Sequence, residues 1–341
     1  MTTNTIHPRY TERSAHDPAL IFQLASGFMA AKHLFAASEL GIFEALGEGP
    51  ADLDRLAART GLTRRATRIS ADAMVSVGLL ERHGDVYENT PTADAFLSGA
   101  TPADMRPLLR FWDKISFPSW IDLAGALARG PAWEIFDLDE SLQPIASAGI
   151  EAFQAGPSQA LPDTVDLTDR HRLLDIGGGT GSWSISLTGR YPHLEATVFE
   201  LPAVAAIANE RIAGAMLGNR IRVRAGDALT DELPTGFDTF LIANLAHYWS
   251  PETNRTLLQR IRNVAEPGAR LLAVDFWTDP THTQPFAAAL MAGEFAVHLR
   301  DGDVYSADEF TEWLSHTGWR FLDHKPLAGP MSVIIAEAAP A

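Results

Sequence analysis

LLDIGGGTG, residues 173–181, follows an apolar run and opens a helical stretch. The apolar run is typical of a buried strand, and the glycines permit a sharp turn that lets a ligand approach the backbone. The helix that follows begins with unpaired N–H groups, which attract a negative group. The stretch therefore predicts a strand, a ligand-binding turn and a helix, which together are the first unit of an open α/β sheet.

The rest of the C-terminal half extends this unit. Apolar runs alternate with helical stretches from residue 171 onward, and seven of the runs are predicted strands: RLLDIG, EATVFE, RIRVRA, FDTFLIAN, ARLLAVDFW, WRFLDHKPL and MSVIIAEA. Alternation of this kind predicts a mostly parallel sheet covered by helices. The last two runs have no helix between them, which predicts a closing antiparallel hairpin. We expect a Rossmann-like α/β domain of seven strands over residues 166–341.

The N-terminal half is predicted to be mainly helical. Residues 1–16 are expected to form a flexible tail and residues 17–100 a winged-helix dimerisation domain, because a helix, a turn, a helix and a hairpin follow one another over 51–98. A helical connector that lines a substrate pocket is expected over 101–165. The apolar stretch 19–31 is interrupted by polar residues and followed by Lys32-His33, so we expect it to be too short to span a bilayer.

Charge and composition narrow the function. The chain has 341 residues, 27 Lys and Arg against 43 Asp and Glu, and a formal net charge of −16. This field repels nucleic acid and anionic membranes, so neither is an expected partner. Arg64, Arg65 and Arg68 lie at the start of the second helix of the winged-helix pattern and leave a SAM- or ligand-sensing regulator that binds DNA as the alternative. With no cysteine, disulfides, thiolate catalysis and cysteine–zinc sites are excluded. No signal peptide is visible, so a cytoplasmic protein is expected.

The glycine spacing favours one cofactor over another. Dinucleotide sites use G-x-G-x-x-G, but Gly177, Gly179 and Gly181 form G-x-G-x-G, and Ser182 follows them. An acid, Asp175, precedes the glycines. This pattern fits S-adenosylmethionine (SAM), which has no pyrophosphate and carries positive charge. A nicotinamide cofactor is the competing interpretation, which calorimetry with both ligands would decide.

Polar residues at the ends of the next strands support SAM. Glu200 ends the second strand and can accept hydrogen bonds from both ribose hydroxyls. Gly226-Asp227-Ala228 follows the third strand, where Asp227 can accept from the adenine amino group while Ala228 donates its N–H to the ring. Asn244, which ends the fourth strand, is also expected to contact the cofactor. A solvated strand-end glutamate is the alternative interpretation for Glu200.

His247 lies just after the fourth strand, where open α/β sheets bind their ligands. The next helix starts there, with Ser250 as its N-cap and Pro251 at its first position.

Earlier in the chain, residues 101–165 are rich in aromatic side chains. Phe111, Trp112 and Phe153 are expected to line an apolar ligand site. Packing between domains is the alternative role for these three.

The chain from about residue 17 to residue 338 resembles the winged-helix class of SAM-dependent O-methyltransferases, the caffeate/acetylserotonin type of plant and bacterial secondary metabolism. The resemblance rests on five segments: AAKHLFAASELGIFEAL, LDIGGGTG, FELP, GDAL and His247-Tyr248-Trp249. It implies a homodimer built by the N-terminal domains, and a histidine base. It also implies SAM contacts from Gly177, Glu200, Leu201, Asp227 and Ala228. In two places the chain departs from the family pattern: Tyr248 replaces an aspartate and Ala243 a lysine.

Glu294 and His298 are one helical turn apart and share a face. By analogy with the family, this segment borders the substrate and Glu294 orients His247. A surface pair is the alternative. With His247 the two residues could also form a site of two histidines and one carboxylate for a metal, which would indicate carbon methylation. No sequence spacing holds the three together, so no metal is expected.

The function expected from these features is methyl transfer from SAM to a hydroxyl of a small aromatic secondary metabolite. Ionising a phenol at pH 7 costs about 4 kcal/mol, because its pKa is near 10. His247 can accept that proton as the methyl group is transferred. Methylation of carbon or nitrogen on a related small molecule, with or without a metal, is the alternative.

Overall fold

The computed structural model describes residues 17–340, so the tail expected over 1–16 lies outside the described residues. The chain divides into two compact units, residues 1–110 and 111–341. Helices of the expected connector from Phe111 onward therefore belong to the same unit as the C-terminal sheet. The two units are described separately below.

The first unit begins with the 21-residue helix α1 (Ala19–Glu39). The apolar stretch was expected to be too short to span a bilayer, and by length and composition this is wrong, because the helix continues for six residues beyond His33. Ser26 does not interrupt it either, since its hydroxyl donates to the carbonyl of Phe22 at 2.7 Å. The break comes at Gly41, whose φ of +72° turns the chain into α2 (Ile42–Gly47).

The remainder of the first unit is the expected winged helix. Asp52 caps α3 (Leu53–Thr60) and Thr63 caps α4 (Arg64–Ser76), each by accepting a backbone N–H. A three-stranded sheet has the order β1-β3-β2. Its strands and the helices after them are β1 (Ala51–Asp52), β2 (Leu80–His83), β3 (Val86–Asn89), α5 (Pro91–Leu97) and α6 (Arg106–Phe111). Two arginines of α4 contact acids, Arg64 with Asp54 and Arg68 with Asp72, which weakens the case for DNA binding.

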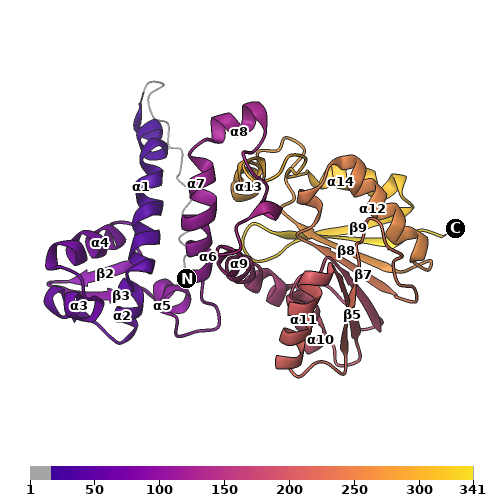
Figure 1. The fold of residues 1–341 in the computed structure, drawn as a ribbon, viewed down its shortest axis with the longest axis horizontal. Coiled ribbons are helices and arrows are strands. Elements are labelled where there is room, and N and C mark those ends of the chain that lie inside the picture. The colour runs from indigo at the N-terminus through magenta and orange to yellow at the C-terminus, as the bar shows by residue number, and fades with distance from the viewer. Residues whose placement is uncertain (1–16, 341) are drawn as a thin grey trace. The chain divides into compact units, whose positions relative to one another are not determined.

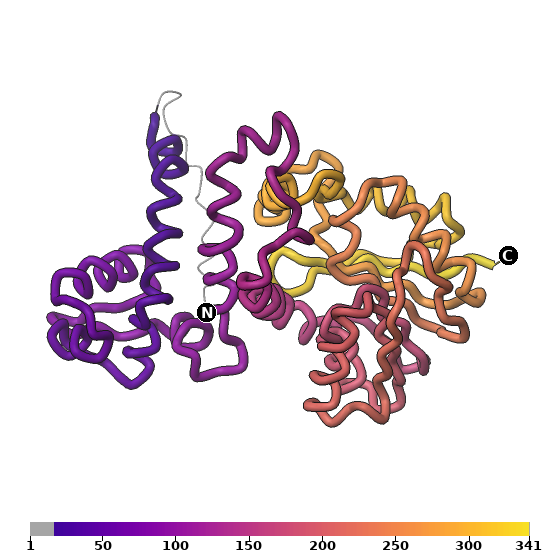
Figure 2. The backbone as a smooth tube through the Cα atoms, in the orientation of Figure 1, coloured from indigo at the N-terminus to yellow at the C-terminus, as the bar shows by residue number. Residues whose placement is uncertain are grey.

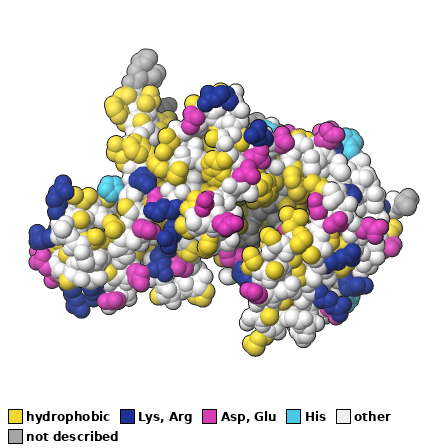
Figure 3. All heavy atoms as spheres, viewed as in Figure 1, with side chains coloured by type: hydrophobic (Ala, Val, Ile, Leu, Met, Phe, Trp, Pro, Cys, Tyr) yellow, Lys and Arg dark blue, Asp and Glu magenta, His cyan; other side chains and the backbone are white. Residues whose placement is uncertain are grey.

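Many apolar side chains of α1 are exposed. Phe22 is 70% exposed and Leu24 67%, and Figure 3 shows hydrophobic side chains gathered along this helix. Among the described residues, α1 is also the one helix that is long and apolar enough to cross a membrane by length and composition. An exposed apolar surface of this size marks a place where something else binds.

The second unit contains the predicted seven strands. The strands are β4 (Arg172–Ile176), β5 (Glu195–Glu200), β6 (Ile221–Ala225), β7 (Thr239–Ala243), β8 (Arg270–Asp275), β9 (Trp319–Pro326) and β10 (Ser332–Ala338). Their order is β6-β5-β4-β7-β8-β10-β9. The pairs from β6 to β8 are parallel, whereas β10 is antiparallel to β8 and β9. The closing hairpin is thus confirmed, and its two strands run side by side in Figure 2.

Helices connect the strands and cover both faces of the sheet (Figure 1). They are η1 (Trp112–Ser116, a π-helix), α7 (Phe117–Trp120), α8 (Leu123–Arg129), η2 (Ile135–Asp137), α9 (Gln143–Thr164), α10 (Ser182–Arg190), α11 (Pro202–Gly214), η3 (Ala246–Tyr248), α12 (Pro251–Val264), α13 (Phe286–Ala296) and α14 (Ala307–His316). One face packs against α9, α10 and α11, and the other against α12 and α14. The fold class, a mainly helical domain followed by a Rossmann-like α/β domain, is as predicted.

The arrangement of the sheet positions the candidate site. Because β4, β5, β6, β7 and β8 are parallel, their carboxyl ends meet at one edge. The residues predicted to bind the cofactor end or follow these strands, and His247 does as well, so they converge on that edge.

Candidate active site

The glycine turn after β4 leaves its backbone accessible. Gly177, Gly179 and Gly181 all have positive φ, at 64°, 56° and 86°. A methyl group on Gly177 would lie 2.9 Å from Leu245, whereas one on Gly179 would meet no atom within 4 Å. Gly177 is therefore needed for close packing. Gly179 instead has open space beside its Cα, where a ligand can approach the turn.

Glu200 lies directly against this turn. It ends β5, the neighbour of β4, and its Oε2 accepts the N–H of Gly179 at 2.9 Å. Its Oε1 accepts the N–H of Leu201 at 2.6 Å. Leu201 itself is 48% exposed, at the start of α11. The structure thus brings together the turn, the acid and the apolar residue that the sequence analysis assigned to one cofactor.

Gly226, Asp227 and Ala228 follow β6, on the other side of Glu200. Gly226 donates its N–H to the Glu200 carbonyl at 2.9 Å, and a methyl group on Gly226 would lie 2.3 Å from the Phe199 ring. This glycine is needed for packing against the neighbouring strand. Asp227 accepts the N–H of Leu229 at 2.8 Å, which holds its carboxylate in the turn.

Asn244 gives a direct indication that this edge binds a ligand. It follows β7 with a φ of +54°, a conformation that a non-glycine residue seldom adopts. The nitrogen and oxygen of its side-chain amide are both buried, and neither has a hydrogen-bond partner among residues 17–340. Buried polar atoms are rarely left unpaired unless a ligand or water completes them. The residues of this edge therefore fit a polar cofactor beside β4 and β7.

A polar network behind the glycine turn was missed by the sequence analysis. Glu151 of α9 accepts hydrogen bonds from Thr180 at 2.8 Å and from Ser182 at 2.5 Å. Arg211 of α11 pairs with Glu151 and also donates to Thr180. Burial raises the pKa of Glu151, but the contacts with Arg211 and the two hydroxyls outweigh burial and leave the pKa below its usual value. Glu151 thus stays ionised and ties α9 to the glycine turn.

His247 and an acid from the next strand form a buried pair. His247 lies in η3, just after β7, and its Nδ1 is 2.7 Å from Oδ1 of Asp275, the last residue of β8. The same carboxylate accepts the backbone N–H groups of His247 and Phe276. These contacts fix the carboxylate, which in turn orients the imidazole. Because Asp275 occupies Nδ1, Nε2 is the nitrogen that can accept a proton from a ligand.

Aromatic rings surround this pair. His247 stacks on Phe295 with the ring centroids 4.1 Å apart and lies 5.8 Å from Phe276. Phe276 stacks on Phe153 at 5.7 Å, and Phe153 meets the edge of Trp112 at 6.1 Å. We call these five residues the aromatic cluster. Two residues expected to line the site, Trp112 and Phe153, therefore lie in a continuous series of rings that reaches His247.

Phe111, the third aromatic residue expected to line the site, packs elsewhere. It lies against the small core of Ile115, Leu138 and Ala146.

Tyr248 packs on His247 with the ring centroids 4.5 Å apart. Burial, followed by the charges of Asp275 and Glu200, raises the pKa of the Tyr248 phenol to about 12. The tyrosine that replaces the family's aspartate is thus a neutral wall of the site.

Glu294 does not contact His247 as the family analogy implied. Its Oε1 accepts from Ser116 at 2.5 Å and its Oε2 from the indole of Trp120 at 2.6 Å. Its other neighbour is His298, with Nε2 3.3 Å from Oε1. Asp275, and not Glu294, orients the imidazole of His247, because Asp275 ends the strand beside β7 whereas Glu294 lies on α13. Glu294 and His298 do share a face, and both are buried rather than at the surface.

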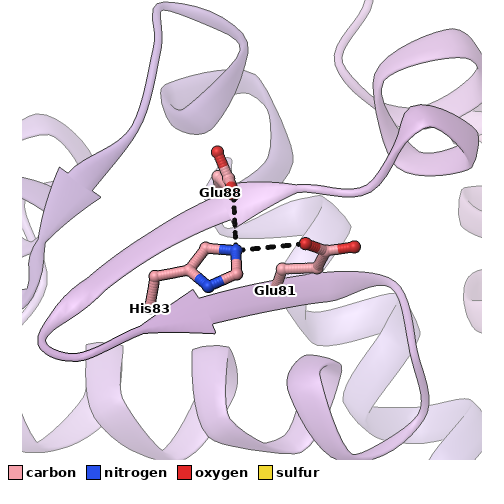
Figure 4. A group of neighbouring side chains, drawn as sticks. All are labelled: Glu81, His83 and Glu88. Atoms are coloured by element: carbon pink, nitrogen blue, oxygen red, sulfur yellow. Dashed lines mark hydrogen bonds and ion pairs between the residues drawn. The ribbon is translucent and has the colours of Figure 1, made fainter.

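The three residues of the metal alternative do not come together. Within residues 17–340, the one group of three His, Cys, Asp or Glu residues close enough to hold a metal is Glu81, His83 and Glu88. Figure 4 shows them on the wing of the first unit, with Nε2 of His83 2.9 Å from Glu88 and 3.2 Å from Glu81. Glu294 and His298 contact each other, whereas His247 pairs with Asp275 instead.

Sequence reasoning missed Asp275, Phe276 and Phe295. The sequence does hold a signal for Asp275, since VDFW places this acid at the end of a predicted central strand, as FELP places Glu200. The two phenylalanines had no such signal, because their approach to His247 depends on how α13 packs.

Family models and relatives agree with the geometry. Residues 124–320 match an O-methyltransferase domain, and residues 22–99 match an O-methyltransferase dimerisation domain. A 3-hydroxy-5-methyl-1-naphthoate 3-O-methyltransferase of Streptomyces sahachiroi is 32% identical, over 88% of this chain and 89% of the relative. The N,N-dimethyltransferase OxyT of Streptomyces rimosus is also 32% identical, over 94% of each chain.

Among solved structures, human N-acetylserotonin methyltransferase in complex with SAM is similar to this chain. The TM-score is 0.83 at 26% identity, and the match covers 96% of this chain and all of the other. The fold, both family models and the relatives point to the same family, and SAM is its cofactor.

Proposed function

The chain belongs to the SAM-dependent O-methyltransferase family, and from that premise we propose that it methylates a hydroxyl of a small aromatic molecule with His247 as general base. The buried pair of His247 and Asp275 at the carboxyl edge of the sheet carries the proposal. A phenol releases its proton at about pH 10, so a base must accept it near neutral pH. His247 presents Nε2 for that task.

The cofactor would be held by residues that end or follow β4, β5, β6 and β7 at the same carboxyl edge of the sheet. We assign Gly177, Gly179, Glu200, Asp227 and Asn244 to this role. Leu201, Gly226 and Ala228 complete the assigned set. Bound SAM supplies an electrophilic methyl group. The buried, unpartnered side-chain amide of Asn244 and the open space beside the Cα of Gly179 are the observations that support this assignment.

The chain's own residues perform three tasks in this proposal. Asp275 holds the His247 tautomer with the proton on Nδ1, so that Nε2 is free to take the proton of the acceptor hydroxyl. The aromatic cluster orients a flat acceptor and excludes water from the reacting oxygen. Asp275 then stabilises the imidazolium that forms when His247 takes the proton.

The test is methyl transfer to a panel of phenols, aryl amines and 2-oxo acids, read by mass spectrometry. His247→Ala is expected to lower kcat by at least about 100-fold while the affinity for SAM changes by less than about threefold. The exposed His316→Ala is the matched control. A kcat near that of the wild type in His247→Ala would contradict the role of this residue. Faster turnover of amines than of phenols would instead support the N-methyltransferase alternative.

The N-terminal unit is proposed to form a homodimer. The match of residues 22–99 to a dimerisation domain and the exposed apolar side chains of α1 support this. Light scattering of the wild type should give twice the monomer mass, and Phe22→Asp with Leu24→Asp should shift the protein toward monomer. A monomeric wild type at micromolar concentration would contradict the dimer.

A further inference from the structure

A second histidine–carboxylate pair lies close to the first and has no part in the proton transfer just described. His298 follows α13 and is only 4% exposed, and Glu294, one turn earlier, is 8% exposed. The ring of His298 also meets the edge of Trp133 at 5.0 Å. Phe295, which lies between Glu294 and His298 in the sequence, is the residue that stacks on His247. Both imidazoles therefore adjoin the same short segment.

The carboxylate of this pair is well satisfied, but the imidazole is not. Ser116 and Trp120 each donate to one oxygen of Glu294. Burial raises the pKa of Glu294, but the neighbouring His298, Ser116 and Trp120 outweigh burial and keep the pKa below its usual value. Neither ring nitrogen of His298 makes a hydrogen bond among residues 17–340, and of the two only Nε2 has a carboxylate near it, Oε1 of Glu294 at 3.3 Å. A buried ring nitrogen without a partner costs stability unless a ligand completes it.

We infer that His298 binds a second hydroxyl on the aromatic acceptor, distinct from the hydroxyl that is methylated. This inference rests on the proposed function and names its substrate class as aromatic molecules with two oxygen substituents. Because the ionised Glu294 faces Nε2, that nitrogen carries the ring proton. Nδ1 is then a hydrogen-bond acceptor, and a hydroxyl is the donor that it fits.

His298 is thus a specificity-determining residue rather than a second base. Its position beside Trp133 and the segment of Phe295 would hold a flat ring against the aromatic cluster. A site built around a hydroxyl rejects an analogue that lacks it, since the analogue leaves the buried nitrogen unpaired. The preference should therefore appear in affinity and KM, and not in kcat.

The test compares 1-naphthol with 1,3-, 1,8- and 2,3-dihydroxynaphthalene. Binding is measured by calorimetry on protein loaded with S-adenosylhomocysteine, and turnover by mass spectrometry. The wild type is expected to bind at least one of the diols about tenfold more tightly than 1-naphthol. In His298→Ala this preference should disappear, while 1-naphthol binds within about threefold of its wild-type affinity.

Two further variants separate the ring nitrogens. The side-chain oxygen of His298→Asn can occupy the position of Nδ1 and should keep part of the preference for the diol. His298→Gln reaches toward Glu294 instead and should lose that preference. Thermal unfolding of each variant verifies that it is folded, and His316→Ala is the control.

Equal losses for the diols and 1-naphthol in His298→Ala would overturn the inference, since a purely structural histidine would act in this way. An absence of any diol preference in the wild type would overturn it as well. Because binding is measured without turnover, these results stay separate from the fate of the His247 proposal, which depends on kcat.

Discussion

The two histidine–carboxylate pairs of the second unit are built in different ways. His247 and Asp275 follow neighbouring parallel strands, β7 and β8, and the carboxylate also accepts two backbone N–H groups. His298 and Glu294 belong to one helical segment, and two side chains satisfy the carboxylate. The first pair is fixed by the backbone of the sheet, whereas the second depends on how η1, α7 and α13 pack. This difference suits the first pair to chemistry and the second to recognition of the acceptor.

The largest expected effect comes from breaking the first pair. Asp275→Asn can donate to Nδ1 and so favours the tautomer with the proton on Nε2, which can no longer accept one. We expect kcat to fall by at least about 100-fold with little change in the affinity for SAM. Steady-state kinetics and calorimetry would measure both quantities.

Asp323→Asn, an exposed acid on the edge strand β9, is the matched control for Asp275→Asn. If Asp275→Asn kept more than a tenth of the wild-type kcat while Asp323→Asn kept all of it, the carboxylate would not control the histidine. The contrast between the two pairs would then lose its chemical basis.

A smaller effect is expected from breaking the second pair. Glu294→Gln removes the charge that faces Nε2 of His298, so the ring is free to place its proton on Nδ1. We expect KM for a dihydroxylated acceptor to rise by about tenfold and kcat to stay within about threefold. A fall in kcat as large as that of Asp275→Asn would instead assign Glu294 to the chemical step, as the family analogy first implied.

The same contrast explains what the sequence could predict. The seven strands with their closing hairpin, the glycine turn, Glu200 and His247 were predicted because each depends on a local motif and on the rule that parallel strands share a carboxyl edge. Glu294 and His298 were found from their helical spacing. Asp275 as the partner of His247 was missed, because pairing between two strand ends depends on register. The approach of Phe295 to His247 depends on tertiary packing, which no local pattern encodes.

The glycine turn adjoins an ion pair of its own, Glu151 with Arg211. Glu151→Gln weakens the contact with Arg211 and loosens Thr180 and Ser182. We expect the Kd for SAM to rise by about fivefold, with kcat at saturating SAM unchanged. Asp163→Asn is the control, since Asp163 also lies on α9 and forms an exposed pair with Arg190 of α10 at 3.2 Å. Equal effects from both variants would mean that Glu151 acts only through general stability.

The last effect concerns stability rather than catalysis and is expected at Asp175, a carboxyl that has no cationic partner among residues 17–340. It is fully buried, its Oδ2 accepts from Ser184 at 2.6 Å, and its Oδ1 has no partner there. Burial raises the pKa of Asp175 to about 7; the Ser184 hydrogen bond opposes this shift and the charge of Glu200 adds to it. In the unfolded chain the value is near 4, so between about pH 4 and pH 7 the folded state binds more protons than the unfolded state.

Stability must therefore fall as the pH rises through this window, by at most about 4 kcal/mol for this one group. Asp175→Asn cannot ionise, so its free energy of unfolding should exceed that of the wild type more at pH 8 than at pH 5. Urea unfolding without SAM at the two pH values measures this difference. If the variant and the wild type lost stability in parallel from pH 5 to pH 8, Asp175 would already be ionised at pH 5. An unseen partner would then have to stabilise its charge, as His247 and His298 do for the two paired carboxylates.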